Sequence, residues 1–477
     1  MSDERSLATD RRGAAAHPQL CAGRRARLAE AMARLGGGVA VLPTAPERQR
    51  NSDNDHPFRH CSHFHYLTGF DEPQAWLLLE ADGRSTLLCR EKNLEREIWD
   101  GHRVGPAAAP AALGVHEAHP VDALDKIATD KLANAPAVWF PFGVHEGLQA
   151  RIDGWLATLR ERERLGVQPP QAQRDLTPVL AEMRLLKDEH ELGTMRRAAR
   201  ISAQAHARAM RFSAAHFRST QGRGLPEYMI EAELLHEFRR HGAQSPAYGS
   251  IVAAGANACV LHYAAGDAEL RPGELCLIDA GCELDGYASD ITRTFPADGS
   301  FSAAQRELYD VVLAAQEAAI AATRPGARKQ DAHWAAVRVL AQGMLDSGLL
   351  NRDKVGDVES VIDSGAYRAF YMHGTGHWLG RDVHDVGEYL SLDEAPVEQP
   401  DGMGGRVVKR PSRVLQPGMV VTIEPGLYVR PAEGVPERFW HIGIRIEDDA
   451  VITDNGCELI SRDVPVAPRE IEALMRG

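Results

Sequence analysis

Apolar and polar positions follow two different periods along the first part of the chain. Residues 20–35 show apolar side chains at helical spacing, and this pattern ends at the glycines 36–38 before a short apolar run that begins at Val39. Two further apolar runs, 75–80 and 85–90, flank an Asp-Gly pair, which favours the positive φ angles of a tight turn. The pattern predicts a helix, a strand and a hairpin, which is typical of an α/β layer.

A charged stretch at 161–178 interrupts this pattern. It is rich in proline and glutamine and nearly free of apolar periodicity, as segments between domains often are. We therefore expect a disordered N-terminus at 1–18, an α/β domain at 19–178 and a second domain at 179–477.

Long amphipathic patterns predict helices in the second domain. They run from Lys187 to Phe212, from Glu227 to His241, and from about Ala303 to Thr323. The rest of this part consists of strand-like segments separated by glycine turns. The expected class is α+β, with helices outside and a sheet inside.

An internal repeat supports this view of the second domain. Pro-Gly pairs at 272–273 and 417–418 each precede a short apolar run, and a carboxylate stands six positions after each glycine: Asp279 in one copy and Glu424 in the other. A Pro-Gly pair before a strand is common, but the shared length, acid and following glycine favour duplication. Two related halves would then each deliver one acid from the end of a strand.

Composition and charge exclude several classes of protein. The chain has 477 residues, of which 44% are hydrophobic, and 67 acidic residues outnumber 54 Lys and Arg, for a formal net charge of -13. A duplex nucleic-acid binder usually has the opposite sign. No signal peptide and no apolar run of about 18 residues stands in the sequence, and seven scattered cysteines without a CxxC pair indicate reduced thiols. We expect a cytoplasmic protein that binds neither nucleic acid nor membrane.

Four acids stand in apolar strand surroundings, where a carboxylate is costly to bury unless it is paired, protonated or bound to a cation. Any one of them could be a salt bridge or a strand-end cap, but all four together with nearby histidines favour a cation site. The four acids are Asp279, Asp290, Glu424 and Glu447.

Histidines gather in YMHGTGHWLGRDVHD, which holds His373, His377 and His384. The glycines between the first two oppose the helix of an HxxxH zinc motif, so a loop or strand that lines a pocket is predicted. His262, in CVLHYAAG, is a fourth candidate.

Carboxylates with one or two imidazoles suit Mn²⁺, Co²⁺ or Zn²⁺, and four acids exceed what one catalytic ion needs. Two ions that share bridging carboxylates could hold a hydroxide and polarise a carbonyl, which is hydrolase chemistry. Arg445, two positions before Glu447 and so on the same strand face, could orient that acid.

The residues that carry this chemistry resemble those of the pita-bread metallopeptidases, and within them the Xaa-Pro aminopeptidases (aminopeptidase P, family M24B) and prolidases. The first domain is similar to that of bacterial aminopeptidase P over 50–73 and 96–105. The matching segments of the second domain are VLHYAAG (260–266), IDAGCELDGYASDITRTFP (278–296), HGTGHWLGRDVHD (373–385), TIEPGLYV (422–429) and GIRIEDD (443–449).

The resemblance implies a role for each candidate. Asp279, Asp290, His377, Glu424 and Glu447 would bind two divalent metals, most often Mn²⁺, with Asp290 and Glu447 bridging them. In the family mechanism a bridging hydroxide attacks the carbonyl before proline while Glu424 shuttles the proton. The substrate-binding and catalytic positions correspond to His262, His373, His384, Arg445 and, in tetrameric relatives, Trp99, which reaches a neighbouring subunit's site.

The implied protein is a homo-oligomer, a dimer or tetramer, that removes the first residue from peptides with proline second. A prolidase restricted to Xaa-Pro dipeptides stays open, because the metal site is common to both. A non-catalytic pita-bread binding module is disfavoured because every ligand is present. Two departures from the family pattern are Arg381, in place of an aliphatic residue, and a long Pro/Gly-rich loop at 391–413, either a solvated surface loop or a flap over the site.

Overall fold

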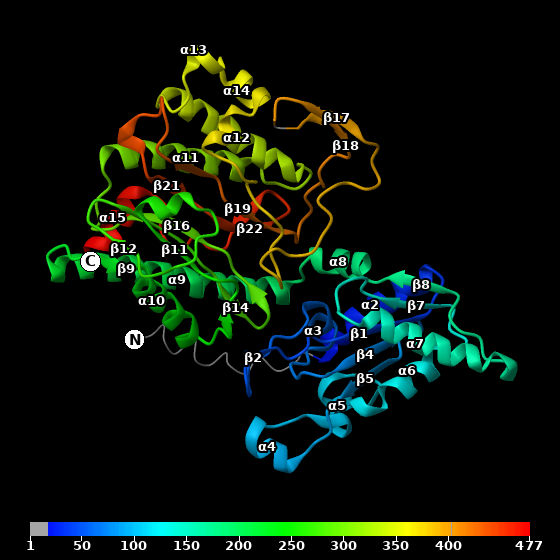
Figure 1. Ribbon diagram of the computed structural model, residues 1–477. Coiled ribbons are helices and arrows are strands. Elements are labelled where there is room, and N and C mark those ends of the chain that lie inside the picture. The colour runs from blue at the N-terminus through cyan, green and yellow to red at the C-terminus, as the bar shows by residue number, and fades with distance from the viewer. Residues whose placement is uncertain (1–17, 402) are drawn as a thin grey trace. The chain divides into compact units, whose positions relative to one another are not determined.

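The computed structural model describes residues 18–401 and 403–477, and the chain divides into two compact units between Met183 and Arg184 (Figure 1). The N-terminus expected to be disordered falls, up to residue 17, outside the described residues. None of the helices within these ranges is long and apolar enough to span a membrane. No disulfide joins any of the cysteines in the described chain.

The first unit is built on a six-stranded mixed sheet in the order β6-β5-β4-β1-β7-β8. The strands are β1 (Val39–Pro43), β4 (Trp76–Glu80), β5 (Ser85–Cys89), β6 (Glu117–Pro120), β7 (Ala137–Phe140) and β8 (Ala172–Asp175), and a small hairpin comprises β2 (Gln49–Asn51) and β3 (Asn54–Asp55). The helices are α2 (Pro18–Arg34), α3 (Ser62–Thr68), α4 (Leu94–Asp100), α5 (Gly105–Leu113), α6 (Leu124–Leu132), α7 (Leu148–Glu161) and α8 (Thr177–Leu185).

The central strand β1 is buried along its whole length, because helices cover both faces of the sheet. Its side chains alternate between two cores: Ala40 and Leu42 pack in one cluster with α2, α3 and α5, and Val39 and Val41 pack in the other with α6 and α7. A strand that is apolar at every position is the expected signature of a sheet covered on both sides. The α/β layer, the first helix and the hairpin of β4 and β5 are thereby confirmed.

The segment 161–178 differs from a linker. It contains β8, which pairs in parallel with β7 at the edge of the sheet. Two of the four β8 side chains are exposed and none is fully buried, so the strand carries no apolar pattern that the sequence could have shown. The chain divides a few residues later, inside α8.

The second unit combines long helices with short strands. Its helices are α9 (Glu189–Thr220), α10 (Glu227–Arg240), α11 (Ala303–Ala322), α12 (Lys329–Asp346), α13 (Arg352–Val355), α14 (Val358–Ser364) and α15 (Pro468–Arg476). Its strands are β9 (Leu225–Pro226), β10 (Ser245–Pro246), β11 (Ile251–Ala254), β12 (Glu269–Leu270), β13 (Leu275–Asp279), β14 (Cys282–Leu284), β15 (Tyr287–Ala288), β16 (Thr292–Pro296), β17 (Val397–Pro400), β18 (Arg406–Lys409), β19 (Val420–Ile423), β20 (Gly426–Val429), β21 (Ile442–Arg445), β22 (Asp448–Ile452) and β23 (Cys457–Leu459).

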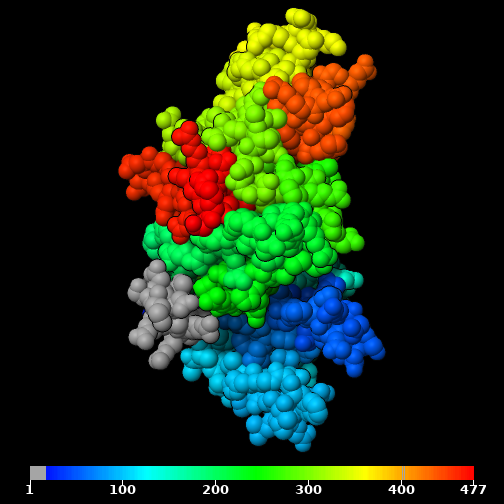
Figure 2. All heavy atoms as spheres, turned by 90° about the vertical axis from the view of Figure 1, so that its left-hand side faces the viewer, coloured from blue at the N-terminus to red at the C-terminus, as the bar shows by residue number. Residues whose placement is uncertain are grey.

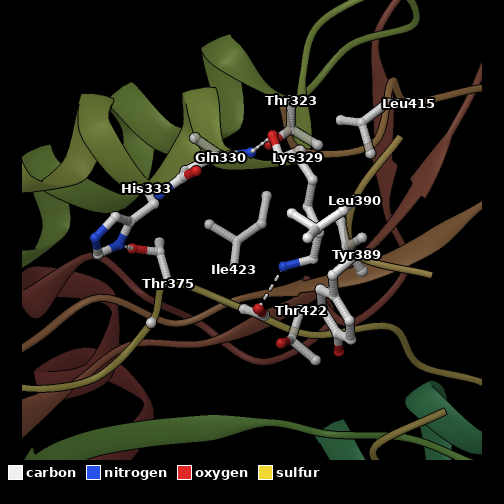
Figure 3. Close-up of a pocket in the computed structure, with 15 residues that line it drawn as sticks. Thr323, Lys329, Gln330, His333, Thr375, Tyr389, Leu390, Leu415, Thr422 and Ile423 are labelled. Atoms are coloured by element: carbon white, nitrogen blue, oxygen red, sulfur yellow. Dashed lines mark hydrogen bonds between the residues drawn. The ribbon is translucent and has the colours of Figure 1, made fainter. Parts of the chain in front are cut away.

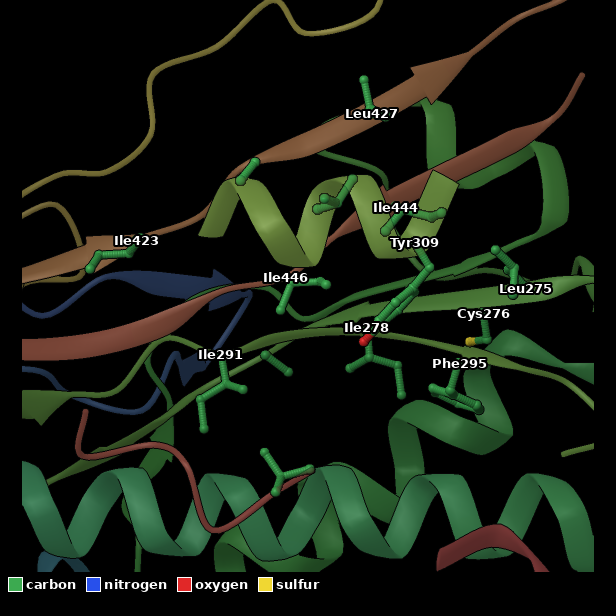
Figure 4. Close-up of a cluster of buried hydrophobic side chains, with 14 of the residues drawn as sticks. Leu275, Cys276, Ile278, Ile291, Phe295, Tyr309, Ile423, Leu427, Ile444 and Ile446 are labelled. Carbon is green, nitrogen blue, oxygen red and sulfur yellow. The ribbon is translucent and has the colours of Figure 1, made fainter. Parts of the chain in front are cut away.

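Helices pack outside these strands, so the predicted α+β class is confirmed. One large core holds side chains of β13, β16, β20 and β21 together with those of α9 and α11, and Figure 4 shows Tyr309 of α11 among the isoleucines of these strands. The three predicted helices correspond to α9, α10 and α11, but α9 continues to Thr220, because Ala214 and Phe217 extend its buried face.

The two copies of the repeat have the same local structure. A helix pair, α9 and α10, precedes β11, β13 and β16, and a second pair, α11 and α12, precedes β19 and β22. Gly273 and Gly418 have φ angles of 82° and 90°, a left-handed turn conformation that glycine adopts without strain. Each turn leads into a buried strand; Asp279 is the last residue of β13, and Glu424 directly follows β19.

Candidate metal centre

One cavity of about 670 Å³ in the second unit is lined by nine of the ten residues that the sequence indicated. The tenth, Trp99, lies in the first unit on α4 and is 82% exposed. The nine are His262, Asp279, Asp290, His373, His377, His384, Glu424, Arg445 and Glu447.

Strand register brings the carboxylates together from positions far apart in the sequence. Asp279 of β13 lies opposite Thr292 of β16, and an isolated bridge pairs Thr292 with Glu447. This bridge joins the two halves of the repeat. Three adjacent chain segments thus place Asp279, Asp290 and Glu447 side by side.

Two of the acids are buried in this cavity, and Asp279 and Glu424 are partly buried. Asp290 and Glu447 are 4% and 2% exposed. Burial and the neighbouring carboxylates raise the pKa of Asp290 and Glu447, and burial raises the pKa of Glu424 to about 7. The carboxylate form of each is therefore costly unless positive charge is nearby.

His377 is oriented toward the acids by its own backbone environment. Its Nδ1 lies 3.0 Å from the carbonyl oxygen of Trp378, and since a carbonyl only accepts, Nδ1 carries the proton. Nε2 then faces Asp290 Oδ2 at 3.4 Å and Glu424 Oε1 at 3.7 Å. Burial alone would lower the pKa of His377, but the hydrogen bond and charge of Asp290 raise it to about 9.

The residues present fit a divalent metal. Ligand atoms of Asp290, His377 and Glu447 all lie within 4.8 Å of one another. The cavity is lined by five carboxylates, among them Glu231 of α10, and by a single guanidinium, that of Arg445. Oxygen donors with one imidazole suit hard or borderline divalent ions, and such an ion would neutralise the excess negative charge.

Arg445 contacts a different acid from the one expected. Its Nη2 donates to Asp279 Oδ2 at 2.6 Å. It reaches Glu447 only through Thr292, whose hydroxyl accepts from Arg445 Nε at 3.2 Å and donates to Glu447 Oε2 at 2.6 Å. Arg445 and Glu447 are two positions apart, but Arg445 ends β21 and Glu447 lies beyond it in the bridge to Thr292, so the alternation of an uninterrupted strand does not apply.

Two tyrosines were not found from the sequence. The Tyr248 hydroxyl lies 2.6 Å from Asp279 Oδ1 and also contacts Asp290 Oδ1. The Tyr428 hydroxyl accepts from Arg445 Nη1 at 3.0 Å and lies 2.8 Å from His373 Nε2. Both tyrosines therefore position the acids or a histidine of the cavity.

The remaining histidines have different surroundings. His373 Nδ1 donates to the Gly374 carbonyl at 2.7 Å, so its Nε2 accepts from Tyr428, and burial lowers its pKa to about 3. The ring of His384 lies 4.2 Å from that of His377 in an edge contact. His384 and His262 are exposed at the cavity and can meet an incoming molecule.

The two departures from the family pattern lie outside this cavity. The Arg381 guanidinium stacks over the Tyr287 ring at 4.6 Å, and Arg381 is not among the lining residues. Within the loop 391–413, β17 and β18 form an antiparallel hairpin. Figure 2 shows this hairpin on the surface beside the segment of α14, where Gly404 approaches Ser364.

Both units of the chain match known protein families. The family model of metallopeptidase family M24 matches residues 193–454, and that of the aminopeptidase P N-terminal domain matches residues 21–139. The Xaa-Pro aminopeptidase of Escherichia coli (strain K12) is 42% identical over 443 residues, which are 92% of this chain and 94% of that protein. The Xaa-Pro aminopeptidase of Haemophilus influenzae is 40% identical over 90% of this chain and 91% of its own.

Solved structures agree with these matches. The aminopeptidase PepP of Pseudomonas aeruginosa superposes with a TM-score of 0.86 at 45% identity, over 95% of this chain and 98% of that one. A Zn-substituted E. coli aminopeptidase P in complex with product superposes with a TM-score of 0.86 at 41% identity, over 96% and 98% of the two chains. The chain therefore belongs to metallopeptidase family M24 and carries the N-terminal domain of aminopeptidase P in front of its pita-bread metallopeptidase domain.

Proposed function

We propose that this chain is a metal-dependent aminopeptidase that hydrolyses the first peptide bond of peptides with proline at the second position. The observation that carries the proposal is the one cavity in which four carboxylates, two of them buried and two partly buried, converge with the Nε2 atom of His377. Relatives named Xaa-Pro aminopeptidase at 40–42% identity over most of the chain support the same activity.

Two divalent ions, with Mn²⁺ the first choice and Co²⁺ or Zn²⁺ as alternatives, would supply a Lewis acid for the scissile carbonyl and lower the pKa of the attacking water. We assign Asp279, Asp290, His377, Glu424 and Glu447 to hold them, with Asp290 and Glu447 shared between the two sites.

Glu424 is placed to move the proton. Its side chain lines the cavity, and its Oε1 lies 3.7 Å from His377 Nε2. Its Oε2 lies 3.7 Å from His373 Nδ1. We propose that Glu424 takes the proton from the attacking water and delivers it to the proline nitrogen as the bond breaks.

Other cavity residues would orient the substrate. Arg445 donates a hydrogen bond to the Tyr428 hydroxyl, which in turn donates to His373 Nε2. This chain of hydrogen bonds keeps the His373 ring neutral and in one orientation. His262 and His384, exposed at the cavity, would contact the peptide. The free amine of the first residue would sit beside the metal centre, which would restrict cleavage to the N-terminus.

Hydrolysis of an Xaa-Pro-Xaa tripeptide and of the matching Xaa-Pro dipeptide, on protein stripped by a chelator and then given Mn²⁺, tests the proposal. We expect metal-dependent release of the first residue from the tripeptide and little turnover of the dipeptide. Preference for the dipeptide would make the chain a prolidase and direct attention to the hairpin of β17 and β18. The absence of metal-dependent activity on either peptide would contradict the proposal.

Two substitutions test the assigned roles. Asp290→Ala should abolish both metal occupancy and turnover, and His373→Ala should keep the metal but slow hydrolysis. Asp454→Ala is the matched control, because Asp454 is an exposed acid of the same unit that does not line the cavity. Full activity in Asp290→Ala would remove the basis for a dinuclear centre.

We also propose that the protein is a cytoplasmic homo-oligomer, a dimer or tetramer, in which α4 contacts another subunit. Leu94, Ile98 and Trp99 of this helix are 72%, 81% and 82% exposed, an apolar surface that a monomer would leave in water. Light scattering of the wild type and of Trp99→Ser tests this arrangement. A monomeric wild type would contradict it.

A further inference from the structure

A second cavity, of about 270 Å³, lies against the loop that carries His373 and His377. It shares only Gly374 and Gly376 with the candidate metal centre, so the two cavities are separate. Its volume is just below the ~300–1,000 Å³ typical of small-molecule sites. Figure 3 shows side chains from α12, from the strand that precedes Glu424 and from the loop around Tyr389 arranged around this space.

Lys329, the first residue of α12, is the one lysine among the described residues that line this cavity, and none of them is an arginine. In Figure 3 it extends between Ile423 and Leu390. Its Nζ donates to the Gly376 carbonyl at 2.6 Å and lies 4.8 Å from the centre of the Tyr389 ring.

The Lys329 ammonium has hydrogen-bonding capacity to spare. An ammonium has three N–H donors, and Gly376 is the one acceptor that it reaches among the described residues; no carboxylate lies within 4.0 Å of Nζ in that part of the chain. Burial lowers the pKa of Lys329 to about 8, although the negative charge of Glu424 acts to raise it. A partly buried cation without a direct counter-ion is costly, and a bound anion would offset that cost.

The rest of the wall is apolar or neutral. No Asp or Glu lines the cavity. His333 is uncharged at neutral pH, since burial lowers its pKa to about 4, and its Nδ1 lies 2.9 Å from Thr375 Oγ1. Leucine, valine and isoleucine side chains form much of the remaining surface: Leu390, Leu415, Val421 and Ile423.

We propose that this cavity binds a small aliphatic monocarboxylate, whose carboxylate group pairs with Lys329 Nζ and whose short apolar body lies against Leu390, Leu415 and Val421. A charge-assisted hydrogen bond would use the donors that Lys329 leaves unused. The apolar walls favour an organic acid over an inorganic anion, because an anion such as phosphate leaves these walls in contact with water or with charge.

Isothermal titration calorimetry with 3-methylbutanoate on the Mn²⁺-loaded full-length protein tests the proposal. We expect saturable binding to the wild type. Lys329→Met, which keeps the length of the side chain and removes its charge, should weaken binding by about tenfold or more. Lys354→Met is the matched control, since Lys354 is an exposed lysine of α13 outside the cavity, and it should bind like the wild type.

A second pair of variants keeps the test decisive if Lys329→Met does not fold. Leu390→Phe enlarges a side chain that lines the cavity and leaves Lys329 in place, so it should also weaken binding. Leu392→Phe, at a position that is 57% exposed and outside the lining, should not. Binding that survives both Lys329→Met and Leu390→Phe would place the acid elsewhere and overturn the proposal.

Two further probes separate the chemistry of the ligand. The neutral amide 3-methylbutanamide has the same apolar body without the charge, and inorganic phosphate has charge without the body. Both should bind at least about tenfold more weakly than the acid. If the amide binds as tightly as the acid, Lys329 does not select the ligand. If phosphate binds as tightly as the acid, the apolar walls do not select it. The absence of saturable binding of the acid would refute the site.

Discussion

Removal of metal should make the stability of this protein depend on the charge of Glu424. Burial raises the pKa of Glu424 from 4.5 to about 7, and its side chain is only 17% exposed. The folded state then holds this proton more tightly than the unfolded state, so the metal-free protein loses stability as pH rises from about 4.5 through 7. The pKa change corresponds to about 3 kcal/mol at pH 8, most of which develops between pH 5 and pH 8.

Urea unfolding in the presence of a chelator, followed by tryptophan fluorescence, measures this effect as a difference between two proteins. Glu424→Gln keeps the shape of the side chain and cannot ionise, so groups other than Glu424 contribute to both proteins and largely cancel. We expect the free energy of unfolding of the variant to gain on that of the wild type by about 2–3 kcal/mol between pH 5 and pH 8. Added Mn²⁺ should restore the wild type at pH 8 and help the variant less.

The reasoning fails if the difference between Glu424→Gln and the wild type is the same at pH 5 and pH 8. It also fails if, without metal at pH 8, the wild type has a higher free energy of unfolding than Glu424→Gln. Either result would mean that the Glu424 carboxylate is accommodated in the folded cavity without a cation.

Three further substitutions separate the parts of the site. Tyr248→Phe removes a hydroxyl that contacts two of the assigned metal ligands, and we expect metal affinity, measured by competition with a chelator, to fall about 10- to 100-fold. Tyr428→Phe breaks the link between His373 and Arg445; kcat should fall by about tenfold in steady-state assays while the metal content stays unchanged. Asp385→Ala leaves two buried cations without the carboxylate they share, so its free energy of unfolding should fall by about 3–5 kcal/mol in denaturant titrations.

Much of the fold could be predicted because the local pattern and the tertiary structure agree. The Asp-Gly turn between β4 and β5 and the long apolar stripes of α9, α10 and α11 specify their elements through nearby residues alone. The edge strand β8 could not be predicted in this way. Its partner β7 lies more than thirty residues earlier, and an edge strand with exposed side chains has no apolar period to show.

The candidate site also contains residues that the sequence could show and residues that it could not. Acids at strand ends can be recognised in a sequence, because a carboxylate next to a buried strand is costly unless it is paired, protonated or bound to a cation. Tyr248 had no such signal: it stands in a loop, and the acids that it contacts lie 31 and 42 residues away. Tyr428 lies four positions after Glu424, but Glu424 precedes strand β20 and does not belong to it, so strand alternation does not place the two residues on one face.

The position of Thr292 links the metal centre to the assembly of the two halves. Thr292 pairs with Asp279 inside the first half and with Glu447 of the second half, and its hydroxyl donates to Glu447 Oε2. The bridge between the halves therefore runs through carboxylates that repel one another when they are charged. A cation bound between these carboxylates acts across the same bridge, so metal binding and the docking of the two halves should stabilise each other.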